Sequence, residues 1–133
     1  MKERKVSVRC EPAILVAVVT ADQEEDFDDL AELAALADTA SGKVVGKVVQ
    51  RRARIDPQFY LGKGKVEELR ARAEELQAET VIFDNDLSPA QVRNLEQALQ
   101  RKVIDRSELI LDIFATHART REACLQVGLA QMQ

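Results

Sequence analysis

Two glycines and two lysines alternate at Gly62-Lys63-Gly64-Lys65, immediately before a segment with helical periodicity. Glycine permits backbone angles with positive φ and lets another molecule approach the main chain closely. The lysines add positive charge where the N–H groups and dipole of a helix N-terminus already favour anions. The G-x-x-x-x-G-K-[S/T] motif of a P-loop is absent. The segment is therefore either a phosphate-binding loop or a tight strand-to-helix turn with solvated lysines.

A basic stretch leads into this loop and supplies further candidate contacts for nucleic acid. The net charge is −4, but acids concentrate between Asp22 and Asp38 and bases between Lys43 and Lys65. A local positive potential attracts phosphates whatever the net charge. Tyr60 and Phe59 can stack on a base, or can pack into the core under the loop. The predicted nucleic-acid-binding residues are Arg51, Arg52, Arg54, Tyr60, Lys63 and Lys65; the alternative for both charge runs is a solvated surface.

Other chemistry has little support in the sequence. The single histidine, His117, lies on an apolar seam, and the two cysteines are far apart, so no zinc site and no catalytic triad is predicted. Asp84 and Asp86 could approach a Mg²⁺ ion beside a bound nucleotide, or could simply form and cap a turn. We therefore predict no catalytic and no metal-binding residues. No apolar run approaches the roughly 20 residues that span a bilayer, so we expect a cytoplasmic protein.

Strand and helix patterns alternate along the chain. Apolar, β-branched runs predict strands at 13–19, 43–54, 80–84 and 102–104. Helical spacing of apolar residues begins at Phe27, at Lys65, after Ser88 and after Asp105. This order predicts an α/β fold, a small four-stranded parallel sheet with helices on its faces. Ligands of such sheets bind at the carboxyl ends of the strands.

Two helix starts are marked by local capping patterns. Ser88 is a predicted N-cap, Pro89 fits the first helical position, and Gln91 completes a capping box. Asp105 and Glu108 repeat the pattern before the last helix.

The last helix is predicted to be long. Its apolar seam continues to Met132 without a C-cap before Gln133, and about 28 residues at about 1.5 Å each exceed what a compact domain needs. We therefore predict an α/β domain at 1–104 and a projecting helix at 105–133 that needs a partner helix, and the chain looks cut within this element. Leu125, Leu129 and Met132 on this helix could pair two copies of the chain into a homodimer.

The order of several motifs resembles HflX-type translational GTPases. The segment Asp56–Lys65 is similar to their D-P-x-x-Y-x-G-x-G-K signature. Three further segments, 83–96, 103–115 and 118–131, continue the resemblance in the same order over most of the chain from about Ala13 onward. Each motif alone is weak, but the series is specific.

This resemblance implies an N-terminal domain followed by the first linker helix, with the P-loop GTPase domain absent. Members of the family bind the large ribosomal subunit and its rRNA and split ribosomes, notably under stress. The resemblance implies the same partners here, with the missing GTPase domain attached in cis. The chain itself is expected to hold no cofactor, whereas the parent protein is expected to use GTP and Mg²⁺. Two alternatives remain open: an ATP-binding domain that uses the loop Gly62–Lys65, and a structural module that only positions the missing domain.

Overall fold

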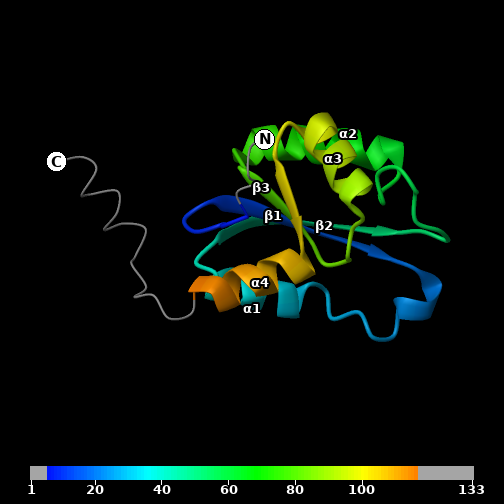
Figure 1. Cartoon of the computed structure of the whole chain (residues 1–133). Helices are drawn as coiled ribbons and strands as arrows, with labels where there is room; N and C mark the ends of the chain where they lie inside the picture. Colours follow the sequence, from blue (N-terminus) through cyan, green and yellow to red (C-terminus); the bar gives the residue numbers. More distant parts are fainter. Residues whose placement is uncertain (1–5, 117–133) are drawn as a thin grey trace.

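The sheet has four parallel strands. The structure, a computed structural model, describes residues 6–116 (Figure 1). The strands are β1 (Pro12–Val19), β2 (Lys43–Arg51), β3 (Thr80–Phe83) and β4 (Lys102–Asp105). Their order across the sheet is β2-β1-β3-β4, and every neighbouring pair is parallel. The predicted fold class is confirmed.

Helices cover both faces of this sheet, two on each face. Figure 1 shows α2 (Lys63–Leu76) and α3 (Pro89–Leu99) on one face, with α1 (Ala31–Thr39) and α4 (Arg106–Thr116) on the other. A short 3₁₀ helix, η1 (Ala21–Gln23), follows β1. The helices within each pair also contact one another, α2 with α3 and α1 with α4. The result is a three-layer arrangement in which the sheet is the middle layer.

The central strand β1 explains why the sheet needs two helical layers. Its residues from Ala13 to Val19 are all buried. Ile14, Val16 and Val18 pack toward α2 and α3, whereas Leu15 and Ala17 pack toward α1 and α4. Side chains alternate across a strand, so a continuous apolar run requires apolar neighbours on both faces.

Both predicted helix starts are present. The Ser88 hydroxyl accepts a hydrogen bond from the Gln91 N–H at 3.1 Å, and the Gln91 side chain accepts one from the Ser88 N–H at 2.9 Å. At the start of α4, the Asp105 carboxylate accepts the Glu108 N–H at 3.0 Å. These bonds satisfy N–H groups that have no partner within the helix.

Three boundaries differ from the predicted ones by two residues or more. Helix α1 begins at Ala31 and not near Phe27, because Asp29 and Leu30 have φ of 58° and 68°, outside the right-handed helical region. Strand β2 ends at Arg51, where its partner β1 also ends at Val19. Helix α2 begins two residues before Lys65, so Lys63 lies in its first turn.

The structure describes only the first part of the predicted long helix. Helix α4 is described to Thr116 and packs on α1; the predicted continuation to Gln133 and the homodimer seam lie outside the described residues. Within residues 6–116, no helix has both the length and the apolar content needed to cross a bilayer.

Candidate functional site

The connection between β2 and α2 carries the predicted loop and is held by many short contacts. The Asp56 carboxylate accepts hydrogen bonds from the N–H groups of Gln58 (2.7 Å) and Phe59 (2.9 Å). Backbone bonds join Asp56 and Tyr60 in both directions, at 2.8 and 3.1 Å. The bond from Phe59 is the main cause that lowers the pKa of Asp56. The turn therefore favours the charged form of the Asp56 carboxylate, and the chain continues from it into α2.

Helix α3 anchors the same connection from the other side. The Gln91 amide donates to the carbonyl oxygens of Asp56 and Pro57, each at 3.3 Å, and the Asn94 amide donates to that of Gln58 at 3.0 Å. The capping residue of α3 therefore also fixes the loop, through contacts about 35 residues apart in sequence.

Gly62 is required for close packing and not for an unusual backbone angle. It is the N-cap of α2 with φ −66° and ψ 151°, and neither Gly62 nor Gly64 has positive φ. The positive φ in this segment, 66°, belongs to Tyr60. A Cβ on Gly62 would lie 2.2 Å from Arg52 Nη1 and 3.3 Å from Gln50 Nε2. A Cβ on Gly64 would meet no atom within 4 Å.

The predicted basic residues face different neighbours. Arg51 Nε lies 2.9 Å from a Glu24 carboxylate oxygen, in the acidic segment that precedes α1. Arg52 Nε donates to the Arg54 carbonyl oxygen at 2.8 Å. Lys65 Nζ lies 3.7 Å from a Glu68 carboxylate oxygen. These cations therefore do not form one continuous, unneutralised patch, although all lie on or beside the β2–α2 connection.

Three of the predicted cations are exposed to solvent. These are Arg51, Arg54 and Lys63, whereas Arg52 and Lys65 are half-buried. The Gly62 N–H donates a hydrogen bond to Gln50 Oε1 at 2.9 Å. No side chain caps the N-terminal turn of α2. That turn is thus a positive helix end with Lys63 beside it.

Tyr60 is turned inward. It is half-buried and packs against the core between the sheet and α2–α3. Burial raises the pKa of its hydroxyl. Phe59 packs against the same core. The predicted stacking of Tyr60 on a base stays a prediction.

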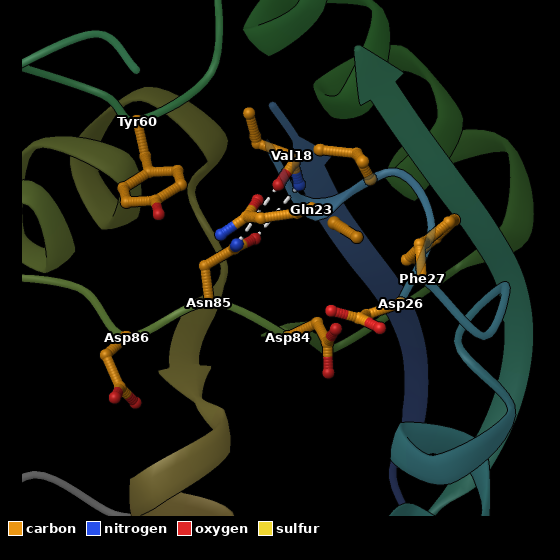
Figure 2. A pocket seen from close by; sticks show the side chains of 10 residues that line it. Val18, Gln23, Asp26, Phe27, Tyr60, Asp84, Asn85 and Asp86 are labelled. Carbon is orange, nitrogen blue, oxygen red and sulfur yellow. Dashed lines mark hydrogen bonds between the residues drawn. The ribbon is translucent and has the colours of Figure 1, made fainter. Parts of the chain in front are cut away.

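A cavity of about 380 Å³ opens where β1 and β3 end (Figure 2). These strands are neighbours whose following connections leave in opposite directions, β1 toward β2 and β3 toward β4. Such a switch point is the usual ligand position of parallel α/β sheets. Asn85 holds the two strand ends together: its carboxamide accepts from the Val18 N–H (2.9 Å) and donates to the Val18 carbonyl oxygen (3.1 Å). Figure 2 shows Asp84 and Asp86 on either side of Asn85.

The cavity wall is acidic. Asp26, Asp84 and Asp86 line it, and none of the lysines and arginines between residues 6 and 116 does. Burial raises the pKa of Asp84, and repulsion from Asp28 adds to this. Arg106 Nη1 lies 2.7 Å from the Asp84 carboxylate. Phosphate groups would meet carboxylates here without a compensating cation, so the cavity does not fit the phosphates of a nucleotide.

The acids at these strand ends also have structural partners. The Ser107 hydroxyl donates to Asp86 at 2.7 Å, and the second Asp105 carboxylate oxygen accepts the Leu87 N–H at 3.0 Å. Among residues 6–116, no three histidine, cysteine or acidic side chains are grouped as metal ligands. Asp86 therefore has a partner in Ser107 at the start of α4, and both of its predicted roles stay predictions.

The sequence analysis singled out Asp84 and Asp86 but not Gln23 and Phe27, which also line the cavity. Phe27 was expected on the buried face of a helix. It instead lies in the segment before α1, beneath the Arg51 guanidinium, whose carbon is 5.9 Å from the ring centroid. No local pattern points to this contact.

A second hollow, of about 290 Å³, lies between β2 and α2. It is lined by Lys47, Val48, Val49, Lys65, Glu68, Leu69 and Arg72. Of its cations, only Lys65 was a predicted site residue. Arg72 follows Lys65 by seven residues, two helical turns, so the spacing alone places both on one face of α2. Lys47 is paired in register with Leu15, which packs toward α1 and α4, so its side chain leaves β2 on the other face of the sheet from α2.

Comparisons with known proteins identify the domain. Residues 27–115 match the family model described as GTP-binding GTPase N-terminal. The chain is 54% identical over 123 residues to GTPase HflX of Lacrimispora saccharolytica and 42% identical over 123 residues to GTPase HflX of Escherichia coli. Each match covers 92% of this chain but only 29% of the relative's length.

Solved structures show the same fold. A GTP-binding protein from Sulfolobus solfataricus in complex with GDP superposes with a TM-score of 0.57 at 27% identity, covering 90% of this chain and 35% of that one. The SsGBP and GDP complex gives a TM-score of 0.60 at 28% identity, covering 91% and 34%. The chain therefore belongs to the GTP-binding GTPase N-terminal family, as the N-terminal domain of an HflX-type GTPase.

Proposed function

We propose that this domain is the ribosome-binding module of a cytoplasmic, HflX-type translational GTPase, and that it contacts rRNA of the large subunit. The whole protein would split or rescue ribosomes. GTP hydrolysis, with GTP and Mg²⁺, would reside in the part of the relatives' length that this chain does not span, since it covers 29% of them.

The observation that carries this proposal is the exposed positive end of α2. Lys63 stands in the first turn of a 14-residue helix whose N-terminus has no side-chain cap. Arg54 is exposed on the same connection. Helix N-termini and lysines contact phosphates without reading sequence, which suits a surface that recognises folded rRNA. Contacts to the carbonyls of Asp56, Pro57 and Gln58 hold the connection against α3, so it is pre-organised.

Co-sedimentation of the chain with purified large subunits, over a range of salt concentrations, tests the proposal. The logarithm of the binding constant is expected to fall by about 0.7–0.9 per logarithm of salt for each phosphate contacted. Lys63→Ala and Arg54→Ala should each weaken binding and reduce this slope. The control is Arg93→Ala, which removes an exposed cation from α3.

A flat salt response would contradict the proposal. Unchanged binding by Lys63→Ala together with Lys65→Ala would instead support the structural alternative, in which the domain only positions the rest of the protein.

The ATP-binding alternative has one observation in its favour, the same uncapped turn of α2 with two lysines. Three observations weigh against it. The Gly62 N–H is already bonded to Gln50, Lys65 lies near Glu68, and the cavity at the strand ends is acidic. Titration calorimetry with ATP and Mg²⁺ discriminates the two functions. If millimolar nucleotide produces no heat of binding, the ATP-binding alternative is wrong.

A further inference from the structure

Strand β2 lies at the edge of the sheet over all of its nine residues. It stands first in the order β2-β1-β3-β4, so β1 is its only partner among the described strands. Just after β2, the Arg52 N–H reaches the Val19 carbonyl oxygen of β1. Peptide groups alternate in direction along a strand, so those of Lys47, Val49 and Arg51 point to the outer edge. An edge of this kind is a template for pairing with another extended chain.

Exposed and half-buried valines accompany this edge. Val44 and Val45 are each 37% exposed. Val48 and Val49 are half-buried and pack toward opposite faces of the sheet. β-branched side chains pack well against the side chains of a neighbouring strand. The composition of the edge therefore suits contact with one more strand.

Every charged residue of β2 is a cation. Lys43, Lys47 and Arg51 are all exposed. Lys47 and Arg51 are in register with residues of β1 that pack toward α1 and α4, so both side chains leave the strand on that face. Among residues 6–116, Lys43 and Lys47 form no ion pair. Arg51 pairs with Glu24, but both side chains are about half exposed, so another carboxylate can replace Glu24 at small cost.

The opposite face of the edge is also positive. The hollow between β2 and α2 has Val48 on one wall, with Lys65 and Arg72 on the other. Glu68 lines the same hollow, but its side chain is 71% exposed and lies 3.7 Å from Lys65, so it neutralises the lysine only weakly. An extended segment laid along the edge would therefore meet cations on both of its faces.

The same cations disfavour a second copy of the chain at this edge. In an antiparallel pair of two β2 strands centred on Lys47, Lys47 would face itself and Lys43 would face Arg51. Like charges directly opposite each other destabilise a sheet, and edge lysines prevent such pairing. Nucleic acid fits less well than a peptide, because phosphate oxygens cannot donate to the outward C=O groups. An extended peptide supplies both donors and acceptors.

We propose that the outer edge of β2 binds an extended acidic segment of a protein partner, which adds a further strand to the sheet. Its main chain pairs with the outward peptide groups of Lys47, Val49 and Arg51. Its carboxylates meet Lys47 and Arg51 on one face, and the cations of α2 lie on the other. Strand addition takes affinity from main-chain bonds and specificity from alternate side chains. The inference goes beyond the proposed function, because its partner is a protein and its surface is not the Lys63 end of α2.

Fluorescence anisotropy with a labelled peptide of alternating glutamate and valine, about eight residues long as an ordinary strand is, tests the edge. We expect saturable binding, with slower hydrogen exchange at the amides of Lys47, Val49 and Arg51. Two control peptides have the same length. Alternating lysine and valine reverses the charge, and N-methylation of alternate residues keeps the charge but removes main-chain donors. Neither control should bind at concentrations that saturate the first peptide.

Substitutions at Lys47 separate charge from main-chain pairing. Lys47→Ala removes the cation and should weaken binding about two- to fivefold, the range of a cross-strand charge pair. Lys47→Pro also removes the outward N–H, which should weaken binding about fivefold more, the factor for one lost hydrogen bond. Proline is compatible with this position because the N–H of Lys47 does not point to β1. Circular dichroism melting of each variant checks that the fold is kept.

Two further variants control for overall charge. Arg93→Ala on α3 and Lys63→Ala on α2 each remove an exposed cation that lies outside β2. Both should bind the glutamate–valine peptide like the unsubstituted chain. Equal weakening by these variants and by Lys47→Ala would show that the peptide responds to net charge alone, and the proposal would be wrong.

The remaining outcomes separate this inference from the proposed function. Equal binding of the N-methylated peptide would contradict strand addition. If the peptide does not bind but Lys47→Ala weakens the binding of a labelled single-stranded RNA, nucleic acid occupies the edge and the inference is wrong. Neither result changes the proposed function, which depends on Lys63→Ala and co-sedimentation with large subunits.

Discussion

The guanidinium of Arg51 is held by the carboxylate of Glu24, with Nε 2.9 and 3.1 Å from its two oxygens. The same guanidinium lies over the Phe27 ring. The acidic segment before α1 therefore occupies the position that a phosphate would take beside Arg51. Both side chains are about half exposed, at 59% and 47%, so the pair contributes little stability and is open to exchange.

Glu24→Gln is expected to strengthen RNA binding, because it releases Arg51 for a phosphate. One added contact should steepen the salt slope by about 0.7–0.9. Anisotropy titrations at several salt concentrations measure this. Glu25→Gln removes the same charge from the next residue, which has no described contact with Arg51, and should change binding less. Equal effects of the two variants would mean that only the overall charge matters.

Gly62→Ala is expected to destabilise the domain by about 1 kcal/mol. The backbone at Gly62 suits alanine, but the new Cβ would displace the Arg52 guanidinium and break its bond to the Arg54 carbonyl. One hydrogen bond of this kind contributes about 1 kcal/mol. Urea denaturation measures the loss.

Two comparisons sharpen the Gly62 prediction. In an Arg52→Ala background, Gly62→Ala should cost almost nothing, because the displaced group is gone. Gly64→Ala has open space around its Cβ and should stabilise the helix by up to about 1 kcal/mol. A full cost of Gly62→Ala in both backgrounds would contradict the role assigned to Arg52.

Arg106→Ala is expected to cost about 1–3 kcal/mol of unfolding free energy. Arg106 pairs with Asp84 at the end of β3 and with Glu32 on α1, so it ties α4 to both. Its removal leaves the mostly buried Asp84 carboxylate without its cation. The double variant Arg106→Ala with Asp84→Asn should recover part of the loss, as measured by urea denaturation. No recovery would show that packing of the arginine, and not its charge, matters.

Asp56→Asn is expected to change the acid sensitivity of the fold. The pKa of Asp56 is lowered from its ordinary value of 3.8, first by the Phe59 N–H bond. The charged form therefore stabilises the folded state above pH 3.8, and this contribution is lost as pH falls through the lowered pKa. Asparagine can keep the same turn but does not titrate. Thermal melts between pH 2 and pH 5 should show a shallower decline for Asp56→Asn than for Asp38→Asn, a variant on α1.

The sequence by itself determined the features that depend on near neighbours. Ser88 and Gln91 are three residues apart, so their capping box follows from the local pattern, as does the Asp105–Glu108 cap. The run from Ala13 to Val19 could be buried only in a strand covered on both sides. The alternation of such elements then predicted the parallel sheet, and the motif series predicted the family.

Tertiary structure alone decided which charges meet. Glu24 and Arg51 are 27 residues apart, and nothing in either segment indicates that one neutralises the other. Val48 of the edge strand β2 lines one hollow with Lys65 and Arg72 of α2 only because the fold places the two elements side by side. Tyr60 lines an acidic cavity because the turn closed by the Asp56–Tyr60 backbone bonds places it there. Electrostatic contacts of this kind depend on distances in space, and chain folding brings such residues together without leaving a periodic pattern in the sequence.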